Sequence, residues 1–427
     1  MVFVSDFRYI VHSNPYNRIL KMKKKNPALL VIFITIFIDL LGFGIIIPLL
    51  PFFSVTVLEL NESMIGLIAG IYSLMQFFFT PIWGSLSDRY GRKPILIISL
   101  IGSVISNILL GLVFSGIMSS MLLLLLSRAF AGIFAANISA AQAVISDVTT
   151  AEERTKGMGL IGAAFALGFV FGPAVGGVLA HKFGFGLPVF FAAALSLIAL
   201  AMAIFIFKES LPAEIIQRNR ANKKIKSLDV RKIIDVIVSP KIGYLVIISF
   251  FIIFAYSNIF GTFQLFAERR DGLALSEAQI GYLFSFLGIM GSFVQLVFLR
   301  LFKHLFGDER SLIIGIFLSI FGLGLIGYST NIPVLLIILF ILAFGNGINN
   351  TIPLSLISQN IGSDEQGSIL GVNQSLGSLA RFFGPVWGGV VYEYLGYKAP
   401  FITGGAIMLL LTFYTIRKYQ QKTKFAP

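Results

Sequence analysis

The residue with the clearest chemical potential in this 427-residue chain is Asp39, an aspartate inside a long apolar stretch. The other acidic residues fall in loops or near the ends of apolar segments. An ionisable side chain at a bilayer centre costs about 2.5–3.5 kcal/mol, so it faces a bundle interior and binds a proton, an ion or a partner. Arg128 lies at a comparable predicted depth and is the expected partner. A rearrangement that separates Asp39 from Arg128 would let Asp39 take up a proton. The alternative is that Asp39 and Arg128 form a structural ion pair that takes no part in proton transport.

Arg381 is the second arginine predicted inside an apolar segment, and it has no evident acidic partner in the sequence. Two interior arginines against one aspartate leave one positive charge in excess. This argues against a simple organic cation as ligand and for a zwitterion, a neutral amphiphile or an anion. The alternative is that Arg381 bonds backbone carbonyls near a kink at Gly384-Pro385.

The composition predicts a membrane protein with many spans. The chain is 56% hydrophobic and 12% charged, whereas soluble domains carry about 25% charged residues. The absence of cysteine excludes disulfides and thiolate zinc sites, and three histidines leave little room for a metal centre. No Walker-type glycine loop points to bound ATP. We therefore expect no enzyme, no metal and no cofactor other than a coupling proton.

Twelve apolar stretches have the roughly 20-residue length of a bilayer-crossing helix. They are predicted at 28–52, 64–86, 95–117, 119–142, 158–181, 185–207, 242–267, 277–302, 311–330, 332–356, 367–392 and 398–417.

The basic residues orient these spans. Of the lysines and arginines between spans, 27 fall on the side of the N-terminus and four on the other, which by the positive-inside rule puts both termini in the cytoplasm. The linker 208–241 is predicted to be cytoplasmic too, either on anionic membrane lipids or simply solvated. Because the basic residues lie between spans, nucleic acid is not an expected partner. Residues 1–27 do not read as a signal peptide, and translation could start at Met1 or Met22.

An internal repeat divides the chain. An offset of 212 residues aligns Gly172-Pro173 with Gly384-Pro385 and Gly176-Gly177 with Gly388-Gly389. Six spans, a linker and six similar spans are typical of duplicated transporters. We expect an all-α membrane protein of twelve helices in two six-helix bundles. The predicted parts are an N-terminal segment 1–27, bundles 28–207 and 242–420, the linker 208–241 and a tail 421–427.

Four motifs, which follow one another along the chain in the family's order, resemble those of the major facilitator superfamily. The likeness is greatest to its twelve-helix drug/proton antiporters, the tetracycline exporters in particular. The stretch 84–94 is similar to the loop between the family's second and third helices, and 39–51 to its first-helix motif. Arg128 with Gly132 resembles the fourth-helix motif, although Ala131 stands where glutamine is common. The glycine pattern beginning at Gly159 is similar to the fifth-helix antiporter motif.

The resemblance implies roles for two of these motifs. The loop would form a gating latch on the cytoplasmic side, with Asp88 bridging to Arg154 and to the start of the eleventh helix near Gly367. The latch residues would be Gly84, Asp88, Arg89, Gly91, Arg92, Lys93 and Arg154. The alternative is a loop that only sets topology. The fifth-helix motif would make a tight interface between the two halves, or simply pack helices. Its residues are Gly159, Gly168, Gly172, Pro173, Gly176 and Gly177.

Further polar and aromatic positions share helix faces and could line a substrate cavity. For any one of them, a hydrogen bond between helices is an equal alternative. The candidates are Phe43, Tyr256, Phe260, Gln264, Asn346, Asn349, Asn350, Gln374 and Arg381.

The function expected from these features is export of small amphiphilic compounds in exchange for protons by alternating access. The resemblance suggests tetracycline-like drugs and a bacterial inner membrane, and we expect a functional monomer. Two alternatives stay open: an exporter of an endogenous metabolite or lipid-like molecule, and a binding protein or sensor on the same scaffold that moves nothing.

Overall fold

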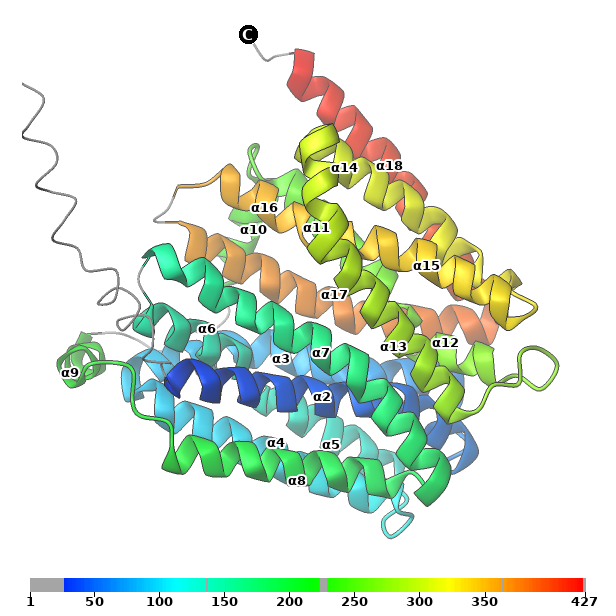
Figure 1. Ribbon diagram of the computed structural model, residues 1–427, viewed down its shortest axis with the longest axis horizontal. Coiled ribbons are helices and arrows are strands. Elements are labelled where there is room, and N and C mark those ends of the chain that lie inside the picture. Colours follow the sequence, from blue (N-terminus) through cyan, green and yellow to red (C-terminus); the bar gives the residue numbers. More distant parts are fainter. Residues whose placement is uncertain (1–26, 136, 150, 223–228, 363–364, 425–427) are drawn as a thin grey trace, which may run out of the picture.

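The computed structural model describes residues 27–135, 137–149, 151–222, 229–362 and 365–424. Every regular element in these ranges is a helix (Figure 1). The first half contains α2 (Pro27–Thr56), α3 (Glu62–Tyr90), α4 (Arg92–Phe114), α5 (Met121–Phe134), α6 (Asn137–Val148), α7 (Ala151–Phe183) and α8 (Gly186–Phe205). The linker contains α9 (Ala213–Asn222) and α10 (Val230–Val238).

The second half is also helical throughout its described part. Its elements are α11 (Gly243–Ser257), α12 (Ile259–Glu268), α13 (Glu277–Phe293), the π-helix η1 (Val294–Phe298), α14 (Leu299–Gly324), the 3-10 helix η2 (Ile326–Tyr328), α15 (Ile332–Asn349), α16 (Ile352–Gln359), α17 (Gln366–Leu395) and α18 (Ala399–Lys424). Helices are expected for apolar stretches of this length because a helix satisfies its own backbone hydrogen bonds away from water.

The predicted all-helical membrane fold is confirmed. Nine helical stretches of the described residues are long and apolar enough to cross a membrane. One of them, Glu277–Tyr328, is 52 residues long and covers two predicted spans, with a non-helical turn at Gly307 between them (φ 76°). The total of twelve spans and the boundaries of the two bundles stay predictions.

Three predicted spans are interrupted helices. The predicted span 119–142 is divided between α5 and α6, and 332–356 between α15 and α16. The span 242–267 is divided between α11 and α12 and contains a kink, where Gly261 has a φ of 123° that favours glycine. Polar residues stand at two of these breaks, Ser257-Asn258 between α11 and α12 and Asn349-Asn350-Thr351 between α15 and α16, but the mean hydropathy of each whole stretch stays high enough for a continuous span.

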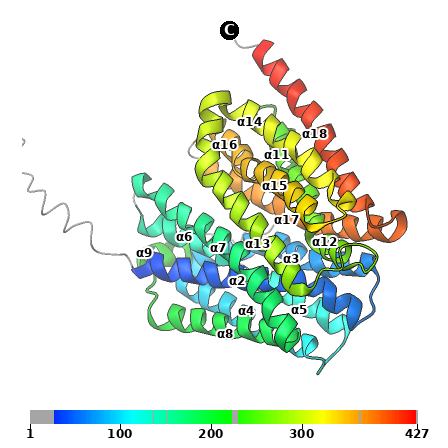
Figure 2. The ribbon, with the colours of Figure 1, turned by 45° about the vertical axis from the view of Figure 1, so that its right-hand side comes forward.

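The buried apolar side chains lie in three clusters that follow the repeat. Two clusters come from helices of the first half. The third comes mainly from the second half but includes Ile47 and Phe52 of α2. Figures 1 and 2 show the blue-to-green helices α2–α8 and the green-to-red helices α11–α18 as two neighbouring bodies.

The two halves meet along two helix pairs, α3 with α17 and α7 with α13. We call the end of the molecule at which α9 and α10 lie the linker end, and the opposite end the distal end. At the distal end the start of α3 contacts the end of α17: a side chain at Gly66 would collide with the backbone of Pro385 and Gly389. The end of α7 contacts the start of α13 in the same way, with Gly177 against Glu277.

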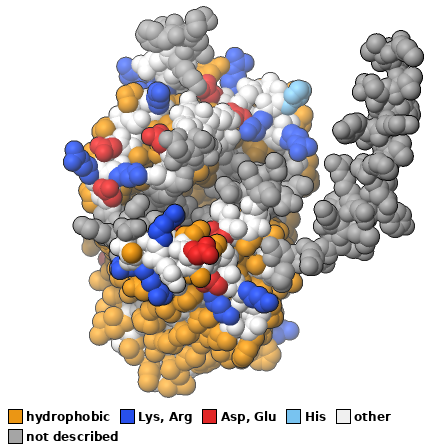
Figure 3. Space-filling view, turned by 90° about the vertical axis from the view of Figure 1, so that its left-hand side faces the viewer, with side chains coloured by type: hydrophobic (Ala, Val, Ile, Leu, Met, Phe, Trp, Pro, Cys, Tyr) orange, Lys and Arg blue, Asp and Glu red, His pale blue; other side chains and the backbone are white. Residues whose placement is uncertain are grey.

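Toward the linker end the same helices have open space beside them. Among the residues that the structure describes, no atom lies within 4 Å of a Cβ placed at Gly84 of α3, at Gly371 of α17, or at Gly159 or Gly162 of α7. Basic and acidic side chains are spread over this end of both halves (Figure 3).

The linker contacts both halves. Asn219 of α9 donates a hydrogen bond to the backbone carbonyl of Asp88 at 2.9 Å, and α10 packs against α11 and α17. Its basic run at 223–228 and the predicted N-terminal segment, apart from Pro27, lie outside the described residues.

Candidate functional site

Asp39 lies on α2 and is partly buried. The hydroxyl of Ser103, on α4, donates a hydrogen bond to its Oδ1 at 3.4 Å. The carboxylate therefore lies where α2 and α4 approach, inside the first half. This position fits an interior site and leaves the carboxylate partly accessible.

Tyr72 of α3 packs against the interior Arg128. The Arg128 guanidinium lies over the Tyr72 ring at 5.0 Å from its centroid, and Tyr72 interacts electrostatically with Asp39, Arg128 and Arg381. Arg128 is 4% exposed, and in the described part of the chain its Nε has no hydrogen-bond partner. Tyr72 carries no distinguishing mark in the sequence, because a tyrosine in an apolar helix is an ordinary residue.

Arg381 belongs to a polar chain across the two halves. Its Nη2 donates to the Ser378 hydroxyl at 3.0 Å, and that hydroxyl donates to Oε1 of Gln76 on α3 at 3.3 Å. Gln374 lies one turn before Ser378 and is exposed. The bond between Ser378 and Gln76 links α17 to α3, so the positive charge of Arg381 lies at the contact between the halves.

Aromatic side chains lie beside this polar group. The Phe43 ring is 5.3 Å from the Tyr72 ring and 6.0 Å from the Phe169 ring on α7. Three predicted cavity residues lie near these charged and aromatic side chains. Phe43 is on α2, as Asp39 is, whereas Gln374 and Arg381 are on α17, which contacts α3. Aromatic surfaces next to a few charged groups suit an amphiphilic ligand.

Three of the six remaining predicted cavity residues bond helices together. Tyr256 hydrogen-bonds the Ser319 hydroxyl at 2.6 Å, and Asn349 donates to the same hydroxyl at 3.0 Å. Gln264 is fully buried; it accepts from the backbone of Gly261 at 3.2 Å and donates to the carbonyl of Ile47 in the first half at 3.1 Å.

The other three cavity candidates lie on the same helices. Phe260 has the non-helical ψ of 92° at the kink of α12. Asn346 is partly buried and Asn350 is exposed. For Tyr256, Gln264 and Asn349 the structure therefore favours the helix-to-helix alternative.

The loop between α3 and α4 is centred on Arg92, which is 7% exposed. Arg92 forms ion pairs with Asp88 at 2.7 Å and with Asp147 of α6 at 3.0 Å. The Arg89 guanidinium lies 5.7 Å from the Tyr90 ring centroid, and Lys93 donates to the carbonyl of Ile204 at 2.8 Å. These bonds join the loop to α6 and α8 within the first half.

Glu209, at the start of the linker, caps α4. Its carboxylate accepts from the backbone N–H groups of Arg92 at 2.9 Å and Lys93 at 3.0 Å. A carboxylate at a helix N-terminus is favourable by about 0.3–1 kcal/mol. Gly91 has a φ of 105°, and a side chain there would collide with the Glu209 carboxylate. Glu209 was not predicted from the sequence, because a glutamate after an apolar span carries no mark of its distant partner.

The predicted bridge from Asp88 to the start of α17 stays a prediction. The side chains of Arg154 and of Gln366 and Gly367 lie outside the described residues. The structure shows Asp88 bonded to Arg92 within its own half.

The fifth-helix glycines serve two contacts. Gly168, Gly172 and Gly176 face α2 of the same half, where a side chain at Gly172 would come within 2.8 Å of Gly44. Gly177 faces the start of α13 in the other half, and Pro173 faces Gly281. Gly159 contacts neither helix closely. The interface predicted between the halves is therefore shared with packing inside the first half.

The aligned glycines of the second half repeat this division. Gly384 faces Phe254 and Ser257 of α11, in its own half, whereas Pro385 and Gly389 face α3 of the other. Glycines at aligned positions of α7 and α17 make the same kinds of helix contact in the two halves. Each contact requires two helices to approach closely, which explains why the glycines repeat in the sequence.

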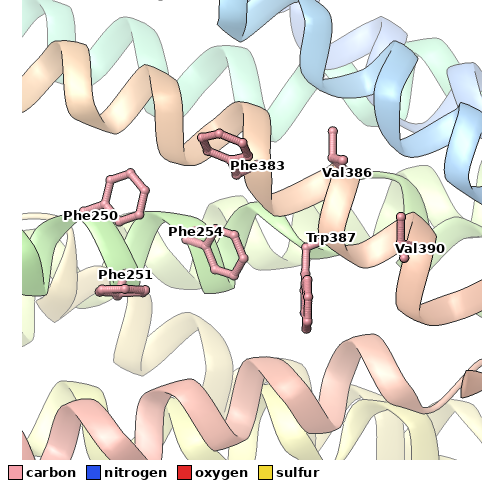
Figure 4. Close-up of a pocket in the computed structure, with 7 residues that line it drawn as sticks. All are labelled: Phe250, Phe251, Phe254, Phe383, Val386, Trp387 and Val390. Carbon is pink, nitrogen blue, oxygen red and sulfur yellow. The ribbon is translucent and has the colours of Figure 1, made fainter.

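A surface groove of about 320 Å³ lies between α11 and α17 (Figure 4). Its lining is apolar and aromatic: Phe250, Phe251, Phe254, Phe383, Val386, Trp387 and Val390. The Trp387 indole N–H donates to the Thr403 hydroxyl at 3.3 Å. The groove offers no charged group, so it is not the polar site described above.

Together, the fold and the interior charges define a polytopic helical membrane transporter. A model of the Major Facilitator Superfamily matches residues 32–385 and 245–427. The chain belongs to this superfamily; it is a transporter and not an enzyme.

Its relatives include drug-resistance proteins. The chain is 29% identical to multidrug resistance protein 2 of Bacillus subtilis (strain 168), over 91% of this chain and 94% of the relative. It is 33% identical to the class E tetracycline resistance protein of Escherichia coli, over 84% of this chain and 87% of the relative.

Solved structures share the fold. The peptide transporter POT superposes with a TM-score of 0.75 at 15% identity, covering 92% of this chain and 94% of the other. The human organic anion transporter MFSD10 (TETRAN) superposes with a TM-score of 0.67 at 24% identity, covering 92% and 99%.

Proposed function

We propose that this protein exports small amphiphilic compounds, with tetracycline-like drugs as candidates, in exchange for protons. The relatives named for tetracycline and multidrug resistance support export of drugs. We also propose a bacterial inner membrane with the linker end in the cytoplasm, which the distribution of lysine and arginine supports.

The observation that carries proton coupling is the setting of Asp39. Its carboxylate lies inside a membrane-spanning helix, is partly buried and accepts a hydrogen bond from Ser103. About one turn further along α2, Phe43 contacts Tyr72, whose ring lies under the Arg128 guanidinium. Burying an ionisable group inside a membrane span costs free energy, so such residues are usually paired or take part in function. Its proton occupancy would change the charge balance of the site as a whole.

The contacts between the halves support alternating access. The halves are packed at the distal end and have open space at the linker end, as expected for a state that receives substrate from the cytoplasm. Rocking one half against the other would then open the distal end. There Asp39 would bind a proton as substrate leaves, and would release it at the linker end when substrate returns.

Proton release from everted, respiring membrane vesicles tests this proposal. The vesicle interior is acidic, so addition of tetracycline outside should raise the interior pH in vesicles with the wild type. Asp39→Asn should abolish this response yet keep exchange of labelled for unlabelled tetracycline, because exchange needs no net proton transfer.

Asp229→Asn is the matched control, since Asp229 is an exposed helix N-cap in the linker and asparagine caps helices equally well. Proton release by Asp39→Asn at the wild-type rate would exclude Asp39 as the coupling group. A wild type that releases no protons with tetracycline, ethidium or rhodamine 123 would exclude drug/proton antiport.

A further inference from the structure

The centre of the contact between α3 and α17 contains a guanidinium without an acidic partner. Arg381 is partly exposed, and in the described part of the chain it forms no ion pair with a carboxylate. Its Nη2 donates to Ser378, which is bonded in turn to Gln76. A guanidinium has five donors in a planar fork that matches a carboxylate. The remaining donors of Arg381 are therefore suited to an anionic oxygen group of a ligand.

The opposite charge lies on α2 of the first half. Asp39 precedes Phe43 by about one helical turn, and the Phe43 ring lies 5.3 Å from the Tyr72 ring. Arg128 is 4% exposed and its Nε has no partner among the described residues. Buried charge without compensation is unfavourable, and a ligand that brings charge of both signs would relieve it.

Three aromatic rings form a continuous apolar surface beside Arg128. Tyr72, Phe43 and Phe169 follow one another at centroid distances of 5.3 and 6.0 Å. They come from α3, α2 and α7, which belong to the first half, whereas Arg381 belongs to the second. Such a surface accommodates an apolar ring system between two polar ends.

We infer that the transported compound is a zwitterionic amphiphile, an inference that rests on the proposed function. Its anionic oxygen group is held by Arg381 with Ser378. Its cationic group lies beside Asp39, where it competes with the proton. Its apolar body lies against Tyr72 and Phe43.

A zwitterionic substrate is compatible both with exchange for protons and with the excess positive charge of Arg128 and Arg381 over Asp39. A purely anionic substrate would bind better when Asp39 is protonated, which would favour movement of both in one direction. A cationic group beside Asp39 instead competes with the proton, as exchange requires. The anionic group then compensates Arg381, which a simple cation could not do.

The experiment uses two dyes that differ in one group. Rhodamine 110 carries a carboxylate and is zwitterionic, whereas rhodamine 123 is its methyl ester and is cationic. Binding of each to the purified protein is measured by fluorescence anisotropy. The wild type is expected to bind rhodamine 110 more tightly. Arg381→Gln is expected to weaken rhodamine 110 by about tenfold or more and rhodamine 123 by less than about twofold, since one charge-assisted bond is lost for the first dye only.

Two further variants keep the test decisive. Arg381→Lys keeps the charge without the fork, so it should fall between the wild type and Arg381→Gln and serves where the latter does not fold. Arg300→Gln removes an exposed arginine from α14 and should change neither affinity. Equal loss of both dyes in Arg381→Gln, or tighter binding of rhodamine 123 by the wild type, would overturn the inference.

The two proposals fail separately. Binding of neither dye by the wild type overturns the zwitterion inference, whereas proton release with tetracycline decides the proposed function. Proton-coupled export of rhodamine 123 with no effect of Arg381→Gln would keep the transporter and reject the ligand class.

Discussion

The distal end and the linker end use their polar residues differently. At the distal end the bonds cross between the halves: Glu393 of α17 accepts from the backbone N–H of Ser63 on α3 at 3.1 Å, and His181 of α7 lies 3.4 Å from Glu277 of α13. At the linker end the described ion pairs stay within one half, as between Arg92 and Asp147. The bonds at the distal end therefore hold the two halves together there. The ion pairs at the linker end stabilise each half by itself, whether or not that end is closed.

The distal contacts also follow the repeat. His181 and Glu393 are separated by the same 212 residues as the aligned glycines, and each approaches the first turn of the partner helix in the other half. The duplicated sequence has thus kept two equivalent closing contacts, although one uses histidine and the other glutamate.

The largest effect should come from blocking one end. Gly66→Leu places a side chain against the backbone of Pro385 and Gly389, and overpacking costs about 1–3 kcal/mol or more. Distal closure should be lost and transport abolished. Because the chain has no cysteine, Gln374→Cys can report accessibility from the linker end. We expect Gly66→Leu to lower its labelling by about tenfold.

Gly84→Leu is the matched control, because Gly84 lies on the same helix and no described atom lies within 4 Å of a Cβ added there. Labelling at Gln374→Cys should stay at or above the wild-type rate. Equal labelling of the Gly66 and Gly84 variants would mean that the distal contact does not set the state.

Removing Arg92 should change stability more than conformation. Arg92→Met leaves Asp88 and Asp147 without the bonds at 2.7 and 3.0 Å, and breaking a buried ion pair costs about 3 kcal/mol. The melting temperature of the purified protein should fall by several degrees, while labelling of Gln374→Cys in folded protein stays unchanged. Arg92→Lys should recover part of the loss. A change in labelling without a change in melting temperature would assign Arg92 to gating instead.

Long apolar stretches made the fold predictable, because they admit only helices in a membrane. Asp39, Arg128 and Arg381 were also predictable, since charge inside such a stretch demands an explanation. Tyr72 was not, because its importance comes only from the three charged residues around it. Gln264 and Asn349 had the spacing of cavity residues, yet their partners, the Ile47 carbonyl and Ser319, bond helices together. Such partners are set by packing between distant segments, which a single sequence does not specify.

Glu393 should make a moderate contribution to distal closure. It places a carboxylate at the N-terminus of α3, where it also accepts from the Asn61 side chain at 3.4 Å. A charge at this position contributes about 0.3–1 kcal/mol. Glu393→Ala should therefore lower labelling of Gln374→Cys by about two- to fivefold, and Glu393→Gln, which keeps an acceptor, by less. An increase in labelling would show that Glu393 opposes closure.

The smallest effect should come from the exposed distal loop, where Arg269 and Asp271 pair within one half. The hydrogen bond from Arg269 lowers the pKa of Asp271 below its ordinary value, and the same bond raises the pKa of Arg269. Because the Asp271 pKa is lower in the folded protein, its contribution is present above the ordinary value of 3.8 and is lost as the pH falls further. Arg269 stays charged throughout this range because the same bond raises its pKa further, so the titration of Asp271 alone sets the pH dependence of the pair.

Asp271→Asn should thus leave the labelling of Gln374→Cys unchanged, because the pair joins no helices of different halves. Any difference in melting temperature from the wild type should be small near neutral pH and should diminish as the pH falls below 3.8. A labelling change as large as that of Glu393→Ala would show that charge at the distal end acts on closure from any position. The difference between the two ends would then come from their total charge and not from the bonds that cross between the halves.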